Sequence, residues 1–114
     1  MEIRMKIAII GSRSASNIDI EKYIGNEVSE IVSGGAVGVD RCAAEYAKRN
    51  GIKLTEFLPE YERYGKGAPI IRNKKIVEYA DKVLAFWDGK SKGTLSVIKY
   101  AKKIGREIEI ITLE

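Results

Sequence analysis

The chain has 114 residues with 45% hydrophobic and 32% charged side chains, a balance typical of a globular domain, and its net charge of +4 is a mild excess. It contains no histidine and one cysteine, which excludes Ser-His-Asp and Cys-His triads, histidine-ligated metals, an intramolecular disulfide and multi-cysteine zinc sites. No apolar run approaches the roughly 20 residues of a membrane span and no leader-like segment opens the chain, so we expect a cytoplasmic protein without a membrane partner.

The amino-terminal part of the sequence predicts two strands around one helix. Residues 5–10 form a short apolar run that Gly11 stops, which is typical of a buried strand. Asn17 can cap a helix over residues 18–28, in which apolar side chains recur on one face. Residues 31–33 then predict a second, brief strand.

The middle of the sequence predicts a helix, a strand and a loop. Residues 39–50 have a helical pattern, and Gly51 stands where a C-terminal cap belongs. Residues 52–58 alternate as in a third strand, which Pro59 ends. The segment 60–68 is the long irregular stretch that the pattern predicts.

The carboxyl-terminal part predicts two further helices and strands. A helix over 69–79 begins with a proline, which suits a first helical turn. Residues 82–87 predict a fourth strand, and a polar loop over 88–93 leads into a helix over 94–103. Residues 107–113 predict the fifth strand.

This alternation of strands and helices predicts parallel strands with right-handed crossovers and helices on both faces. We expect one domain over residues 1–114 with an α/β, three-layer, Rossmann-like doubly wound sheet of five strands in the order 3-2-1-4-5. Its switch point then lies between the first and fourth strands, where such sheets hold ligands.

Three glycine-bearing loops follow the carboxyl ends of the first, second and fourth predicted strands. In an open parallel sheet these loops meet in the ligand crevice. The candidate binding residues that they contain are Gly11, Ser12 and Arg13; Ser33, Gly34, Gly35, Ala36, Gly38 and Asp40; and Asp88, Gly89, Ser91, Gly93 and Thr94.

The chemistry of these loops predicts an anion site. The glycines of the second loop let the backbone approach a ligand and leave the amides of the next helix pointing into the crevice. Gly93 and Thr94 offer the same arrangement at the following helix, with the Thr94 hydroxyl as an extra donor. Arg13 adds a positive charge that can make paired hydrogen bonds to phosphate.

Some of these residues have equally simple structural interpretations. The paired glycines alone could form a tight turn, and Asp40 could cap its helix or pair with Arg41 instead of binding a ribose hydroxyl. Trp87 ends a core strand, so we favour packing over stacking on a base. Tyr61 and Tyr64 could form a lid over the crevice or anchor their loop.

Two common nucleotide-binding motifs are missing from the sequence. The first loop does not read Gly-x-Gly-x-x-Gly, which argues against a standard dinucleotide-binding fingerprint. No Gly-x-x-x-x-Gly-Lys-Ser/Thr occurs either, so the sequence does not predict a P-loop NTPase.

Four motifs occur in chain order: Gly11-Ser12-Arg13, Ser33-Gly34-Gly35-Ala36-x-Gly38-x-Asp40, Arg72-Asn73 and Ser91-x-Gly93-Thr94. Together they resemble the SLOG superfamily and, within it, the small YspA-like group of Rossmann-type nucleotide-binding proteins. The resemblance covers nearly the whole chain. It implies a nucleotide or nucleotide-derived small molecule in the crevice, and we expect no cofactor and no metal.

The Lonely Guy branch of this superfamily consists of phosphoribohydrolases that release a base from a nucleoside monophosphate. That branch carries Pro-Gly-Gly-x-Gly-Thr-x-x-Glu after the fourth strand, and Arg72 matches its helix arginine. Here Val97 stands at the position of the glutamate, and glycosidic cleavage needs a negative group or a base. The resemblance therefore implies hydrolysis only if Asp88 or Asp40 substitutes for that carboxylate.

The DNA-processing protein A branch binds single-stranded DNA and carries similar motifs in the first two loops. That branch works with a partner protein and further domains, and the small net charge of +4 argues against many phosphate contacts. We therefore expect a nucleotide-binding module, with an N-glycosidic hydrolase and a weak single-stranded nucleic-acid binder as alternatives. Related folds often pair through helix faces, so a homodimer is the expected oligomeric state.

Overall fold

The computed structural model describes residues 5–12, 18–25, 28–35 and 38–113. Its centre is a five-stranded sheet in the order β3-β2-β1-β4-β5, and every neighbouring pair is parallel. The strands are β1 (Met5–Gly11), β2 (Val28–Ser33), β3 (Lys53–Glu56), β4 (Lys82–Trp87) and β5 (Glu107–Thr112). The predicted α/β class and the predicted strand order 3-2-1-4-5 are confirmed.

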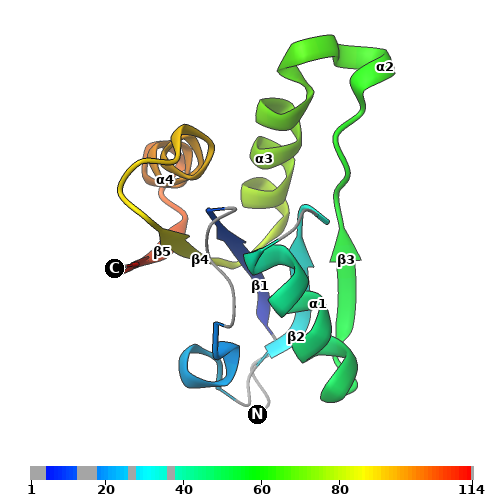
Figure 1. Cartoon of the computed structure of the whole chain (residues 1–114), viewed down its shortest axis with the longest axis vertical. Helices are drawn as coiled ribbons and strands as arrows, with labels where there is room; N and C mark the ends of the chain where they lie inside the picture. The colour runs from blue at the N-terminus through cyan, green and yellow to red at the C-terminus, as the bar shows by residue number, and fades with distance from the viewer. Residues whose placement is uncertain (1–4, 13–17, 26–27, 36–37, 114) are drawn as a thin grey trace.

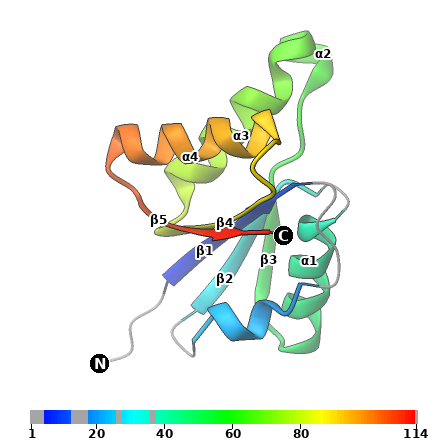
Figure 2. The ribbon, with the colours of Figure 1, turned by 60° about the vertical axis from the view of Figure 1, so that its left-hand side comes forward.

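Helices cover both faces of this sheet, which gives three layers (Figures 1 and 2). On one face lie the 3₁₀ helix η1 (Ile20–Tyr23) and α1 (Val39–Arg49). On the other face lie α3 (Ala68–Tyr79) and α4 (Lys92–Ile104). A short helix α2 (Tyr61–Tyr64) and the 3₁₀ turn η2 (Gly65–Gly67) precede α3 and project away from the sheet (Figure 2). In the described part of the chain, no helix has the length and apolar character needed to cross a bilayer.

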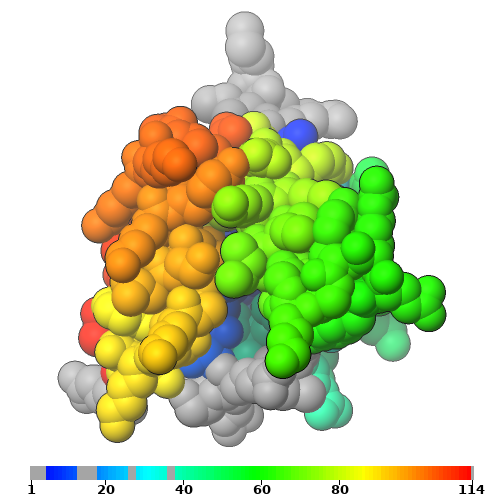
Figure 3. Space-filling model, turned by 90° about the horizontal axis from the view of Figure 1, so that it is seen from above, coloured from blue at the N-terminus to red at the C-terminus, as the bar shows by residue number. Residues whose placement is uncertain are grey.

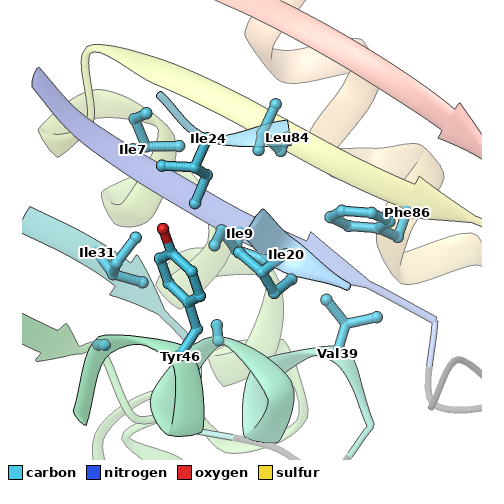
Figure 4. Close-up of a cluster of buried hydrophobic side chains, with 11 residues drawn as sticks. Ile7, Ile9, Ile20, Ile24, Ile31, Val39, Tyr46, Leu84 and Phe86 are labelled. Atoms are coloured by element: carbon cyan, nitrogen blue, oxygen red, sulfur yellow. The ribbon is translucent and has the colours of Figure 1, made fainter. Parts of the chain in front are cut away.

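The two central strands are apolar on both faces, which explains why their sequences read as continuous apolar runs. Ile9 and Phe86 are fully buried on the side of α1, where they pack with Tyr46 and Val39 (Figure 4). On the opposite side of the sheet a second cluster lies between the strands and the helices α3 and α4, and its members are Ala8, Ile10, Val32, Ile76, Val77, Ala80, Val83, Val97 and Ala101. Burial on both sides fixes the strand register, because a shift of one residue would exchange the two faces.

The prediction of a helix over residues 18–28 is wrong. Among residues 18–25 only Ile20–Tyr23 form a 3₁₀ turn, and Val28 already belongs to β2, while Asn17 lies outside the described residues. Tertiary pairing overrides the helical pattern, because Val28 pairs with Met5 of β1. The predicted brief strand over 31–33 is correspondingly longer.

The remaining elements lie close to their predicted positions. The stretch 60–68, predicted as irregular, contains α2 and η2, and the helix that follows carries a proline in its first turn as predicted. The last helix begins at Lys92, two residues before the predicted Thr94, and Gly105 ends it with φ of 74°.

Candidate functional site

A cavity of about 200 Å³ opens at the carboxyl edge of the sheet, between α3 and α4. Figure 3 shows the side of the molecule that α3 and α4 cover. The two helices lie side by side there, and residues of β1 are seen in the hollow between them. We call it the α3–α4 cavity. Its described lining residues are Ile10, Gly11, Gly34, Asp40, Pro69, Arg72, Asn73, Ile76, Ser91, Gly93 and Thr94.

Arg72 is held across the end of β2 by three hydrogen bonds. Its Nη1 donates to the carbonyl oxygens of Gly34 at 2.8 Å and Phe57 at 3.3 Å, and its Nε donates to Oδ1 of Asn73 at 2.8 Å. Burial lowers the pKa of Arg72, while the charges of Asp40 and Tyr61 act in the opposite direction. An arginine nonetheless stays charged at neutral pH, so the cavity has a fixed cation in its wall.

The close approach of Arg72 requires a glycine at position 34. A Cβ atom on Gly34 would lie 2.5 Å from Nη1 of Arg72 and 3.2 Å from Oδ2 of Asp40. Both contacts are shorter than real Cβ atoms make freely, so a side chain at this position would displace the guanidinium. The sequence predicts that Gly34 lets the backbone approach a ligand closely. In the structure, Gly34 also makes room for the side chain of Arg72.

The loop between β4 and α4 is built by its own hydrogen bonds. Oδ1 of Asp88 accepts from the backbone amides of Lys90 and Ser91 at 2.8 Å each, and the Trp87 indole donates to the Ser91 carbonyl at 3.0 Å. The Ser91 hydroxyl caps α4 by accepting from the Thr94 amide at 3.3 Å. These contacts aim the amino-terminal turn of α4, with its positive end of the helix dipole, at the α3–α4 cavity.

The start of α1 contributes a buried carboxylate to the same cavity. Gly38 is the N-cap residue with φ of 79° and forms no side-chain cap, and Asp40 in the first turn is 9% exposed. Arg41, the next residue, forms an ion pair with Glu45 at 3.5 Å. The charge of Asp40 acts on Arg72, whose pKa it raises.

The structure brings eight of the predicted site residues into the wall of this cavity: Gly11, Gly34, Asp40, Arg72, Asn73, Ser91, Gly93 and Thr94. Others lie beside it with structural contacts. The Ser12 hydroxyl accepts from the Asp88 amide at 3.2 Å, and the Ser33 hydroxyl accepts from the Gly35 amide at 3.4 Å. The turns just described include or adjoin three more of the predicted residues, Gly38, Asp88 and Gly89. The structure does not describe the remaining two, Arg13 and Ala36.

A second cavity, of about 440 Å³, lies between the end of β3, α2 and α3, and we call it the α2–α3 cavity. Its lining residues are Glu56, Phe57, Leu58, Glu60, Tyr64, Ala68, Ile71, Arg72 and Lys75. Arg72 is therefore common to both cavities. Sequence reasoning missed this one, although the pair of tyrosines in the irregular stretch was a signal, since Tyr64 lines the cavity and Tyr61 is exposed.

The position of the Lonely Guy glutamate contributes nothing to this site. Val97 is 1% exposed and packs from the buried side of α4 into the core. Among the described lining residues of the α3–α4 cavity, Asp40 is the one acidic side chain. Within the described ranges, no three acidic or cysteine side chains are grouped to hold a metal ion.

The doubly wound sheet with a cavity at its switch point defines a Rossmann-like α/β protein of the kind that the SLOG motifs imply. Residues 5–64, more than half of the 114, match the YAcAr family, which comprises YspA and cpYpsA-related SLOG proteins. The chain belongs to this family. No curated protein matches the sequence.

Two solved structures share the fold. DNA processing protein A from Streptococcus pneumoniae has a TM-score of 0.80 and 25% identity, over 96% of this chain and 50% of that chain. The second is DNA processing protein A from Helicobacter pylori, described with its single-stranded DNA binding mode; it has a TM-score of 0.75 and 24% identity, over 96% of this chain and 66% of that chain. The chain thus spans half of the first protein and 66% of the second.

Proposed function

We propose that the chain binds a nucleotide or a related phosphate-bearing metabolite, with the phosphate and sugar in the α3–α4 cavity. The observation that carries the proposal is that Gly34, Arg72 and Thr94, from segments far apart in the sequence, line one cavity at the switch point. Sheets of this type hold ligands at that point. The family membership supports the same ligand class.

The phosphate would lie between Arg72 and the amino-terminal turn of α4. Nη1 and Nε of Arg72 donate to Gly34, Phe57 and Asn73, so the Nη2 donors are the ones that would bond a charged phosphate oxygen. The first amides of a helix and its dipole favour a negative group in the same place. Arg13, whose position the structure does not describe, is a further phosphate ligand in this proposal on the strength of its sequence motif.

The other loop residues would orient the sugar and hold the loops. Asp40 faces the cavity and can accept hydrogen bonds from ribose hydroxyls. Ser12, Ser33 and Asp88 support the turns through backbone amides and would act on the ligand indirectly.

A titration panel tests the phosphate requirement. We expect AMP and ribose 5-phosphate to bind and to raise the melting temperature with the logarithm of their concentration above the Kd, whereas adenosine should bind far more weakly. Arg72→Gln should lower the affinity for the phosphorylated ligands about tenfold or more, because the charge is lost. Isothermal titration calorimetry measures the affinities of the three ligands and the effect of Arg72→Gln on them, and a thermal-shift assay measures the melting temperature.

Arg41→Gln is the matched control, because Arg41 is exposed and paired with Glu45 on the outside of α1. It should leave both affinities unchanged. Equal affinity for adenosine and AMP, or binding that Arg72→Gln does not weaken, would contradict the proposal.

Single-stranded DNA is a second candidate ligand. The likeness to DNA processing protein A from Streptococcus pneumoniae, with a TM-score of 0.80, favours it. Fluorescence anisotropy with a labelled oligonucleotide tests it, because such binding should weaken steeply between about 50 and 200 mM salt. An affinity that does not depend on salt would remove this candidate.

Cleavage of the N-glycosidic bond is less well supported than binding, because Val97 is buried where the related hydrolases carry a glutamate. Prolonged incubation of nucleoside monophosphates with the protein should therefore release no free base. Release of base that Asp40→Asn abolishes would instead identify a hydrolase.

A further inference from the structure

The α3–α4 cavity is too small for a whole nucleotide. Its volume is about 200 Å³, whereas cavities that hold drug-sized ligands have roughly 300–1,000 Å³. The α2–α3 cavity is about 440 Å³, and Arg72 belongs to the walls of both. A ligand anchored by its phosphate at Arg72 therefore has a larger space next to its anchor.

The α2–α3 cavity has the chemistry of a site for an uncharged ring. The side chains of Glu56 and Glu60 balance the positive charges of Lys75 and Arg72 in its wall. Lys75 is further occupied, with its Nζ 3.9 Å from Glu60 and 5.5 Å from the centre of the Tyr64 ring. This balance gives a second phosphate no advantage here, whereas the α3–α4 cavity adds the first turn of α4 to its Arg72–Asp40 pair of charges.

Apolar and aromatic groups make up much of the remaining wall. The rings of Phe57 and Tyr64 and the aliphatic side chains of Leu58 and Ile71 line it. Leu58 is 64% exposed, so its side chain is accessible to a ligand in the cavity. A planar heterocycle would bury Leu58 and contact the rings, since bases stack on aromatic and apolar groups.

We propose that the α2–α3 cavity receives the base of a nucleotide whose phosphate lies beside Arg72 in the α3–α4 cavity. This inference rests on the proposed function. The glutamates also define which base is favoured. Glu56 can accept hydrogen bonds from a ring amino group, so adenine fits the wall better than hypoxanthine, which carries a carbonyl at that position.

The test compares AMP with ribose 5-phosphate, which is the same ligand without its base. In calorimetric titrations the parent protein should bind AMP about tenfold more tightly than ribose 5-phosphate. Tyr64→Ala should weaken AMP binding to nearly that of ribose 5-phosphate and leave ribose 5-phosphate unaffected. Glu62→Ala is the control on the same short helix, and it should preserve the tenfold preference because Glu62 is exposed and does not line the cavity.

A second pair of variants guards against a folding defect in Tyr64→Ala. Leu58 and Ile70 are both exposed, at 64% and 51%, so alanine at either position should leave the fold intact. Leu58→Ala should reduce the preference for AMP, whereas Ile70→Ala should not. The amino-group assignment is tested with IMP, which should bind more weakly than AMP, and Glu56→Gln should narrow that difference while Glu62→Gln does not.

The outcomes separate this inference from the proposed function. If AMP and ribose 5-phosphate bind equally well, or if Tyr64→Ala and Leu58→Ala leave the preference unchanged, the base lies elsewhere and the inference is overturned while phosphate binding stands. If neither ligand binds, the proposed function fails and the inference fails with it. Equal affinity for AMP and IMP overturns the role of Glu56.

Discussion

At the scale of the residue, Arg72 links the fold to the candidate site. Its bonds to the carbonyls of Gly34 and Phe57 tie α3 to the ends of β2 and β3, over 38 and 15 residues of sequence. The same guanidinium lies in the walls of both cavities. If the proposed function holds, neighbours of Arg72 should affect ligand binding even where they do not touch a ligand.

Gly34→Ala should disturb the site through Arg72. The added Cβ would lie 2.5 Å from Nη1, so the guanidinium must move and lose its bond to the Gly34 carbonyl. We expect AMP affinity to fall about tenfold and stability to fall by about 1 kcal/mol, measured by titration and urea unfolding. Gly67→Ala is the control, because no heavy atom lies within 4 Å of its added Cβ and its φ is −82°. Unchanged affinity in Gly34→Ala would show that the position of Arg72 does not matter.

Glu30 is a buried carboxylate at the opposite end of β2 from the site. It is 7% exposed, and its Oε2 accepts hydrogen bonds of 2.6 Å from both Thr55 and Tyr79. Burial raises the pKa of Glu30, but these hydrogen bonds and the charges of Lys53 and Lys6 outweigh that effect and leave the pKa below its ordinary value. The ionised form is thus the one that the fold stabilises.

The protein should consequently lose stability in acid. A carboxylate with a lowered pKa contributes its full stabilisation above the ordinary glutamate pKa, about 4.5, and loses it as the pH falls through the folded-state pKa. Glu30→Gln should cost about 1–3 kcal/mol at neutral pH and flatten the acid side of the profile, as measured by urea unfolding from pH 7 to 3. Glu45→Gln, on the exposed side of α1, should change stability little. An acid profile identical in Glu30→Gln and the parent would refute this assignment.

At the scale of the element, the first turn of α4 combines a structural cap with the candidate phosphate site. The Ser91 hydroxyl accepts from the Thr94 amide, and it also bonds the Thr94 hydroxyl at 3.2 Å. The Thr94 amide already donates to the Ser91 hydroxyl, so the amides of the residues before Thr94 in this helix are the ones that can bind an anion. The sequence placed this helix start two residues late, because Ser91 rather than Thr94 marks the boundary.

Ser91→Ala should destabilise the protein by about 1 kcal/mol, the usual cost of losing a serine N-cap. Chemical denaturation measures this loss. Ser96→Ala, in the interior of the same helix, should alter stability by only a few tenths of a kcal/mol. Similar losses for the two variants would mean that the cap contributes nothing.

At the scale of the whole molecule, stability should be highest at the centre of the sheet. Ile7–Ile10 of β1 and Val83–Phe86 of β4 are buried on both faces, whereas β5 bonds to β4 alone and exposes half or more of its residues. In native-state hydrogen exchange, amides of β1 and β4 should exchange last and those of β5 earlier. Simultaneous exchange of the three strands would indicate that the sheet opens as one unit.

The sequence by itself determined the architecture. The apolar runs at 5–10 and 82–87 and the alternating helices predict a parallel sheet, because burial on both faces demands such runs. The glycine-bearing loops follow strand ends, so their meeting at one edge followed from the topology. Arg72 and Asn73 entered through the family resemblance, and the structure brings both to the cavity.

Only the tertiary structure decided the rest, since those features depend on contacts between distant segments. Residues 18–28 have a helical pattern, but pairing of β2 with β1 prevents a helix over this whole range. The pattern of a short sequence segment does not include this pairing, because the two strands are distant in the sequence. The α2–α3 cavity exists because the chain after β3 passes α3 at Arg72, where Phe57 and the guanidinium meet. Which loop residues face the cavity and which hold turns was likewise decided by packing, because serine and glycine suit both roles.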